Sequence, residues 1–373
     1  MAENPTMLTY IRETPATYAA QLEGRVELTG QLVELWASGR YRSVWLVACG
    51  SSANAAACAR PFMRLCLQAD VQLVNPTALT FSDYLPADDV LCLVISQSGC
   101  STNALAALDH LRAQGRHAVG VTANADSDFR EHADLLVDYG VGSELVGYVT
   151  KGMAGLVHFL MLFALEASRA VGSLSAAAYG RLVSDLSLAP FAHEAVQARA
   201  EAFYLAKRRA LTSMGPTYVV GYDQAFGVAQ EAALKLGETV KVPAFAYDAD
   251  EFAHGPNLQL TPAYTLFFVD DLNHGSGRLK DIARACVPLA GPRGFLLTDD
   301  ASLDGLTTLL LPSVREGRPA HPLMLPLYAL PAFQYVAWRT TDELHRWETH
   351  PLVDEMDDAL ATKTEAISRI MPW

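Results

Sequence analysis

The sequence predicts an α/β protein made of two tandem doubly wound domains, each a parallel sheet covered by helices. Short apolar runs alternate with helical stretches along most of the 373 residues, which is the order expected of parallel strands joined by crossover helices. The length suits two domains with a core each, and 51% of the residues are hydrophobic. A helical lead and a tail complete the predicted architecture.

Residues 7–38 show helical spacing, and Pro15 predicts one break within it. We therefore assign residues 1–40 to a helical lead-in and residues 41–180 to the first domain. In this domain we predict strands at residues 43–48, 71–74, 90–95, 118–122 and 135–137, and a long closing helix from about 151 to 170.

The second domain, residues 181–345, repeats the scheme after a mixed helical connection over residues 184–210. We predict its strands at residues 217–221, 265–269, 295–297 and 307–311, and a helix near 323–340. Residues 346–373 form a tail that begins with a charged stretch. That composition is typical of a solvated tail or of a helix that docks elsewhere.

The composition limits the kinds of partner and site that the sequence predicts. A formal charge of -13 gives no general attraction for nucleic acid or an anionic membrane. The six cysteines form no CxxC pair, so neither a metal site nor a disulfide framework is predicted. The amino terminus has no basic stretch followed by an apolar run, and the apolar segment 156–165 is too short to span a bilayer. We expect a cytoplasmic protein without nucleic-acid or membrane partners.

Two serine-rich turns follow predicted parallel strands, where such sheets bind ligands. The first is Gly50-Ser51-Ser52 and the second covers residues 96–102. Their hydroxyls and the backbone N–H groups at helix starts suit a phosphate even without Lys or Arg. The alternative is that Ser52 and Ser101 are ordinary helix caps. Two such turns in one sheet favour a phosphate site.

Glu231, Lys235 and Glu238 fall on one face of a predicted helix. A solvated face with an ordinary ion pair is the alternative, but the Ala, Leu and Gly neighbours favour burial, and buried Glu and Lys are typical of functional sites. His254 precedes a Gly-Pro pair and is predicted in a turn, from which it can reach a cleft. A lone histidine is more often structural.

Taken in order, these motifs resemble the tandem sugar-isomerase (SIS) domain family. The resemblance is to the isomerase half of glutamine–fructose-6-phosphate amidotransferase and to its shorter relatives, the fructosamine-6-phosphate deglycases. It spans nearly the whole chain and is carried by residues 11–15, 48–52, 96–99, 142–144, 150–151, 231–238 and 251–256. It implies two flavodoxin-like SIS domains and no metal or organic cofactor.

The resemblance also implies roles for single residues. It assigns the phosphate and sugar contacts to Ser51, Ser52, Ser96, Gln97, Ser98 and Thr102, to which we add Gly50 and Glu231. Glu238 matches the catalytic glutamate, Lys235 the helix lysine and, in a looser match, Lys363 the C-terminal lysine of the sugar site. His254 matches a ring-opening histidine that comes from the neighbouring subunit, which implies a homodimer with shared sites. Whether dimers pair into tetramers stays open.

Two departures from the family bear on the reaction. No glutaminase segment precedes the sugar half, so we expect no glutamine-derived ammonia. Ser51 replaces a threonine of the synthases, and Cys100-Ser101 replaces their Glu-Thr, which leaves phosphate binding intact and the sugar undetermined.

The leading hypothesis is a deglycase of a 6-phosphorylated fructosamine. His254 would help to open the ring, and Glu238 would move a proton from C1 to C2 through an enediol-type intermediate. Lys235 or Lys363 would stabilise the oxyanion, and water would release the amine and an aldose 6-phosphate. An aldose–ketose phosphate isomerase or an amino-sugar 6-phosphate deaminase would use the same residues. A non-catalytic phosphosugar sensor is the third hypothesis, although it needs no Glu238 and the chain has no basic helix-turn-helix segment.

Overall fold

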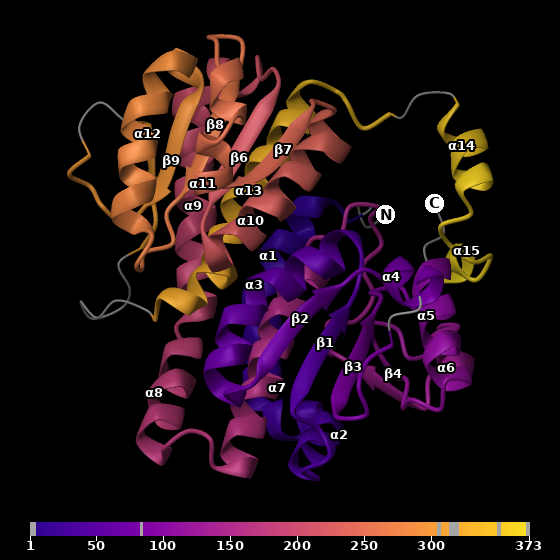
Figure 1. Ribbon diagram of the computed structural model, residues 1–373. Helices are drawn as coiled ribbons and strands as arrows, with labels where there is room; N and C mark the ends of the chain where they lie inside the picture. The colour runs from indigo at the N-terminus through magenta and orange to yellow at the C-terminus, as the bar shows by residue number, and fades with distance from the viewer. Residues whose placement is uncertain (1–4, 83–84, 304–306, 313–320, 349–351, 371–373) are drawn as a thin grey trace. The chain divides into compact units, whose positions relative to one another are not determined.

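The computed structural model describes residues 5–82, 85–303, 307–312, 321–348 and 352–370. The chain divides into two compact units (Figure 1). Unit 1 comprises Met1–Pro5, Ala16–Val183 and Thr349–Trp373, and unit 2 comprises Thr6–Pro15 and Ser184–Glu348. Two helices, α1 (Met7–Glu23) and α8 (Ala176–Leu186), run across a boundary of this division.

The sheet of unit 1 is parallel and five-stranded, in the order β2-β1-β3-β4-β5. Its strands are β1 (Ser43–Val47), β2 (Asp70–Val74), β3 (Val90–Ile95), β4 (Val119–Thr122) and β5 (Leu135–Asp138). The direction of winding changes between β1 and β3. The loops that follow these two strands therefore lie side by side at the carboxyl edge of the sheet, where doubly wound folds bind ligands.

Helices cover this sheet and pack on one another. They are α2 (Arg25–Ala37), α3 (Gly50–Leu67), α4 (Pro76–Phe81), α5 (Thr102–Ala113), α6 (Phe129–His132) and α7 (Lys151–Val171), with α14 (Val353–Leu360) and α15 (Ile367–Ile370) from the tail. Trp45 and Val47 of β1 pack in one buried cluster with Leu108 of α5 and Phe129 of α6. Helix α7 packs against α2 and α3, which buries it on several sides.

Among the described residues, α7 is the one helix long and apolar enough to cross a membrane. The predicted helix at about 151–170 is therefore confirmed, and the apolar segment 156–165 is part of a longer apolar stretch within it, so the prediction that it is too short to span a bilayer is wrong. Most of α7 is enclosed, because 83% of its most apolar 18-residue window is buried inside the protein. Such burial is typical of a core helix.

Unit 2 repeats the winding of unit 1. Its parallel sheet has the order β10-β9-β8-β6-β7, so β6 takes the place that β1 has in unit 1. The strands are β6 (Thr217–Gly221), β7 (Ala244–Asp248), β8 (Thr265–Val269), β9 (Gly294–Thr298) and β10 (Thr307–Leu310). The fold class predicted from the sequence, two doubly wound α/β units with helical ends, is confirmed.

The helices of unit 2 are α9 (Ala189–Leu211), α10 (Asp223–Lys235), α11 (Ala249–Ala253), α12 (Ser276–Ala290) and α13 (Leu325–Glu343). Shorter turns are η1 (Leu236–Val240), η2 (Pro256–Gln259), η3 (Gly291–Arg293) and η5 (Pro322–Met324). Helices α11 and α12 share one buried cluster with the sheet. Phe203 of α9 and Phe333 of α13 contact the rings of Phe295 and Phe267 in β9 and β8.

Strand β7 was not predicted from the sequence. Strand β7 lies at an edge of its sheet, and none of its five residues is fully buried. Its sequence, Ala244-Phe245-Ala246-Tyr247-Asp248, contains no β-branched residue, and β-branched residues are part of the signal that indicates a strand.

The predicted break at Pro15 is wrong, because α1 continues through this residue to Glu23. Proline has no N–H, so the carbonyl of Ile11 loses its helical donor four residues later. The side chain of Gln197 supplies a replacement, since its Nε2 donates to Ile11 O at 3.1 Å. The helix keeps a satisfied backbone at the proline and turns only at Gly24.

Candidate active site

The first serine turn of unit 1 is the start of α3. Cys49 is the helix cap, in an extended conformation, and Gly50 opens the helix with φ of 57°, a left-handed conformation that favours glycine. Ser51 and Ser52 follow inside the first turn, whose backbone N–H groups have no acceptor within a helix. Ser52 is therefore not the cap, and the geometry is that of a helix start able to receive an anion.

The second serine turn lies between β3 and α5 and is closed by its own hydroxyls. Ser96 Oγ and Ser101 Oγ are 2.9 Å apart, and Gly99 N donates to Ser96 Oγ at 3.2 Å. Cys100 N donates to Ser98 Oγ at 3.3 Å. Ser101 stands at the cap position of α5, but its hydroxyl makes no capping bond to the helix. The hydroxyl faces the turn instead, so Ser101 belongs to the candidate site.

Lys363 reaches this turn from the tail of the same unit. Its Nζ donates to Ser101 Oγ at 2.7 Å and to Ser98 Oγ at 3.3 Å. The backbone fixes this approach, since Ser101 and Lys363 form an antiparallel bridge and Thr364 N donates to Cys100 O at 2.9 Å. Burial lowers the pKa of Lys363. The structure thus brings an amine to Ser98, which is predicted to hold the phosphate, and to Ser101 in the same turn.

Thr102 has a different environment from the one its predicted role requires. Its backbone N donates to Thr362 O at 3.2 Å, and its hydroxyl donates to Ala361 O at 2.8 Å. Both donors that would bind a phosphate are engaged by the tail. A phosphate contact at Thr102 stays a prediction that requires these residues to move.

Gln97 is oriented by a residue that the sequence analysis did not assign to the site. Its Nε2 donates to Glu144 Oε2 at 2.9 Å. Glu144 is buried and lies in the segment before α7, whose first N–H groups donate to it. Its burial raises the pKa of this carboxyl, and the hydrogen bonds that it accepts oppose the rise. The available signal was the segment around residues 142–151, which belongs to the family resemblance.

Gly99 offers a test of the turn. Its φ is 66°, and a Cβ there would lie 1.9 Å from Ser127 Oγ, whereas Gly115 has a similar φ of 70° and nothing within 4 Å of such an atom. Gly99→Ala should therefore lower the free energy of unfolding by about 1–3 kcal/mol more than Gly115→Ala, the excess being the cost of overpacking. Chemical denaturation of both variants measures this. Equal losses would contradict the crowding.

The candidate catalytic face of unit 2 lies where α10 gives way to the π-turn η1. Glu231 and Lys235 are each 1% exposed, whereas the side chain of Glu238 is 29% exposed. Lys235 Nζ lies 3.3 Å from Glu231 Oε1 and forms a hydrogen-bonded ion pair with Glu238 Oε1. The structure therefore brings the three predicted side chains into contact, with Glu238 at the accessible end.

The electrostatics of this triad suit a proton acceptor. Burial disfavours the charge on Lys235, but the carboxylates of Glu231 and Glu238 outweigh it and raise the pKa of Lys235. Burial also raises the pKa of Glu238, against the pull of Lys235. A partly exposed carboxylate with a raised pKa beside a fixed ammonium can take and return a proton.

His254 lies in a turn, as expected. It caps α11 at the carboxyl end, is exposed, and is followed by Gly255 and the turn η2. Its backbone N donates to Glu251 O at 3.1 Å. An exposed imidazole is available to another molecule, but the ring-opening role stays a prediction.

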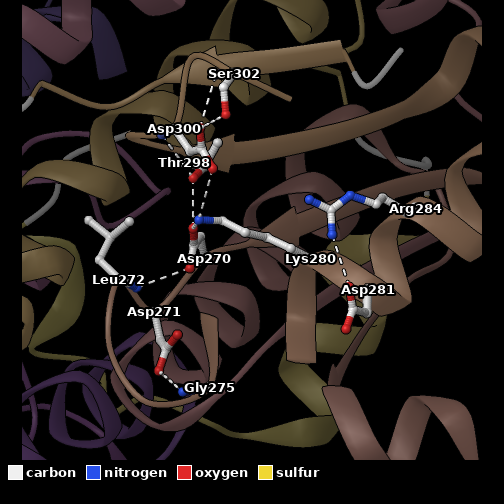
Figure 2. A network of polar contacts seen from close by, with 10 residues as sticks. All are labelled: Asp270, Asp271, Leu272, Gly275, Lys280, Asp281, Arg284, Thr298, Asp300 and Ser302. Carbon is white, nitrogen blue, oxygen red and sulfur yellow. Dashed lines mark hydrogen bonds and ion pairs between the residues drawn. The ribbon is translucent and has the colours of Figure 1, made fainter. Parts of the chain in front are cut away.

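The turn after β8 in unit 2 corresponds in topology to the second serine turn of unit 1, but its chemistry differs (Figure 2). Asp270 is fully buried, 3.1 Å from Lys280 Nζ, and it accepts from Thr298 Oγ1 at 2.6 Å and from Leu272 N at 3.1 Å. A closed network around a carboxylate does not favour an anion. Within the described residues, the hydroxyl-lined turns belong to unit 1.

Comparison with known proteins confirms the resemblance. No family model matches the chain. Glutamine–fructose-6-phosphate aminotransferase (isomerizing) of Zymomonas mobilis is 28% identical over 333 residues, 86% of this chain and 52% of that protein. The enzyme of the same name from Symbiobacterium thermophilum is 30% identical over 263 residues, 68% of this chain and 43% of that protein. The chain thus spans about half the length of the curated relatives it matches.

A solved structure gives the same fold. The C-terminal domain of glucosamine-fructose-6-phosphate aminotransferase from Francisella tularensis matches with a TM-score of 0.83 and 18% identity, covering 94% of this chain and 99% of that chain. The part of the aminotransferases that this chain resembles is their isomerase half.

Proposed function

We propose that this homologue of the isomerase half of the glutamine–fructose-6-phosphate aminotransferases is a phosphosugar enzyme, and specifically a deglycase of 6-phosphorylated ketosamines. The observation that carries the proposal is the partly exposed carboxylate of Glu238, paired with the buried ammonium of Lys235. A sensor would need no such base. The relatives' names couple a nitrogen donor with fructose 6-phosphate, which supports a substrate that bears nitrogen on a ketose 6-phosphate.

The phosphate end of the substrate is assigned to the two serine turns of unit 1. Hydroxyls and first-turn N–H groups donate to phosphate oxygens without any added positive charge, and Lys363 supplies one amine beside Ser98 and Ser101. These local donors explain how an acidic protein would accept an acidic ligand. The net charge of -13 repels anions in general, so the attraction must be local.

The chemistry is assigned to unit 2. Glu238 takes a proton from C1 of the open-chain ketosamine and returns one at C2. The C2 oxygen gains a proton from water and the nitrogen loses its own to water, so that C2 becomes an alcohol and C1 an imine. The adjacent ammonium of Lys235 disperses the negative charge that develops on the C2 oxygen. Water then adds to the imine and the C–N bond breaks, giving an aldose 6-phosphate and the free amine. His254, from a second copy of the chain, is proposed to open the ring first.

The test is a substrate panel. Purified chain is expected to release a free amino acid from the fructosamine 6-phosphate of that amino acid, measured by chromatography of the amine. Fructose 6-phosphate and glucosamine 6-phosphate are the controls. Turnover of only these simple phosphates would replace the deglycase by an isomerase or deaminase, and binding of all without turnover would replace it by a sensor.

A further inference from the structure

Glu144 ties the start of the core helix α7 to the second serine turn. Oε1 accepts from Thr150 N at 2.8 Å and from Lys151 N at 3.0 Å. Oε2 accepts from Gly152 N at 2.9 Å and from Gln97 Nε2 at 2.9 Å. Three of the four donors belong to the beginning of α7, as in a helix cap. The fourth is a side chain of the turn that is proposed to hold the phosphate.

This fourth bond sets the orientation of the Gln97 amide. The other end of that amide, Oε1, is buried and has no donor in the described part of the chain. The backbone of Gln97 is held separately, because its carbonyl accepts from Thr122 Oγ1 and Ala123 N, each at 3.0 Å. An amide nitrogen carries two hydrogens, so the bond to Glu144 leaves one for a ligand.

The packing around this amide is close. A Cβ at Gly152 would lie 1.9 Å from Gln97 Nε2 and 2.9 Å from Glu144 Oε2. The backbone of α7 therefore approaches the turn at a point where a side chain of any size would push the amide away. The hydrogen bond to Glu144 and the close packing against Gly152 therefore hold the Gln97 amide in one position.

We propose that Glu144 is a positioning residue for phosphosugar binding, acting through Gln97. This inference rests on the proposed function and deepens it. Glu144 holds the Gln97 amide and the second serine turn in the geometry that receives the phosphorylated substrate. Its loss should therefore weaken binding rather than proton transfer, which is assigned to Glu238.

The test compares Glu144→Gln with Glu166→Gln. In the first variant an NH₂ group replaces one acceptor oxygen and faces either Gln97 Nε2 or the backbone N–H groups, all of which are donors. A bond to Gln97 can then form only if the Gln97 amide turns over and presents Oε1, which removes the N–H orientation set by Glu144. The dissociation constant for fructose 6-phosphate, measured by calorimetry, is expected to rise about ten- to a hundredfold, since a bond to a charged acceptor is lost. The kcat is expected to change by less than about threefold.

Glu166 is a matched control because it lies on α7, the helix whose first N–H groups Glu144 binds, and is 2% exposed, with Arg25 Nε at 2.8 Å and Arg169 Nη2 at 2.7 Å. Its replacement by glutamine also removes a buried charge but leaves the serine turn alone. We expect a lower unfolding midpoint and an unchanged dissociation constant. Unchanged binding in Glu144→Gln, with stability lost as in the control, would reduce Glu144 to a helix cap and overturn the proposal.

Gln97→Ala provides the second arm. Because Glu144 and Gln97 act as one unit, the double variant should bind no more weakly than the weaker single variant. Additive losses would overturn the proposal. Wild-type binding of fructose 6-phosphate without amine release would refute the deglycase but not the role of Glu144, so the two failures are distinguishable.

Discussion

Glu238→Gln is expected to lower kcat for the ketosamine substrate about 10²–10⁴-fold, the usual contribution of a positioned general base. The side chain is 29% exposed and the substitution keeps its shape, so the affinity for fructose 6-phosphate should stay within about threefold of wild type. Steady-state kinetics and calorimetry measure the two. Glu343→Gln, in the same unit and bonded to Tyr204 at 2.9 Å, is the control that should keep full activity.

The pH dependence of activity tests the role of Glu238 as the base in a second way. Burial raises the pKa of Glu238, and the base acts only when deprotonated. Activity should therefore fall, as the pH is lowered, at a value above the ordinary glutamate pKa of about 4.3. An acid limb at or below that value, or full turnover in the glutamine variant, would remove Glu238 from the mechanism.

The same variant tests whether His254 comes from a second copy. Mixing inactive Glu238→Gln with inactive His254→Ala under exchange conditions creates one site with both native residues in each mixed dimer. Activity should return to about a quarter of wild type if sites are shared across a twofold interface. No recovery would place the histidine in the same chain as the base or outside the reaction.

The largest effect on stability is expected from Lys235→Met. Lys235 is buried between Glu231 and Glu238, and its removal leaves two carboxylates facing each other without a counter-ion. Breaking a buried ion pair on one side costs about 3–5 kcal/mol, which chemical denaturation would measure as a lowered midpoint. Lys207→Met, in α9, is the control and should change stability by less than about 0.5 kcal/mol.

A second substitution separates charge from packing. In Lys235→Met with Glu231→Gln, one of the uncompensated carboxylates is neutral, so part of the lost stability should return. If Glu231→Gln lowers the free energy of unfolding by the same amount in the Lys235→Met background as in the wild type, the two side chains do not act as a pair.

The sequence was most informative where structure is local. The strands whose side chains are buried, such as β3 and β8, appear as short apolar runs, and small polar residues mark the turn after β3. The face shared by Glu231, Lys235 and Glu238 follows from helical spacing alone. These features depend on residues that are neighbours in the chain, and a periodic pattern records them directly.

The parts that could not be predicted depend on distant residues. Gln97 and Glu144 are 47 positions apart, and Lys363 and Ser98 are 265 apart, so no spacing rule links them. The continuation of α1 through Pro15 depends on a donor from Gln197, 186 positions from its acceptor Ile11. The engagement of Thr102 by the tail is of the same kind, and only the fold reveals it.

The π-turn that carries Glu238 has a consequence for how this residue is placed. A π-turn holds one more residue per turn than the helix before it, so the direction of the carboxylate is a property of the backbone winding and not of a side-chain rotamer. Removing Leu236 or Gly237 would restore ordinary winding and rotate the position of Glu238 by about 100°. The carboxylate would then point in another direction, although Glu231, Lys235 and Glu238 would all still be present.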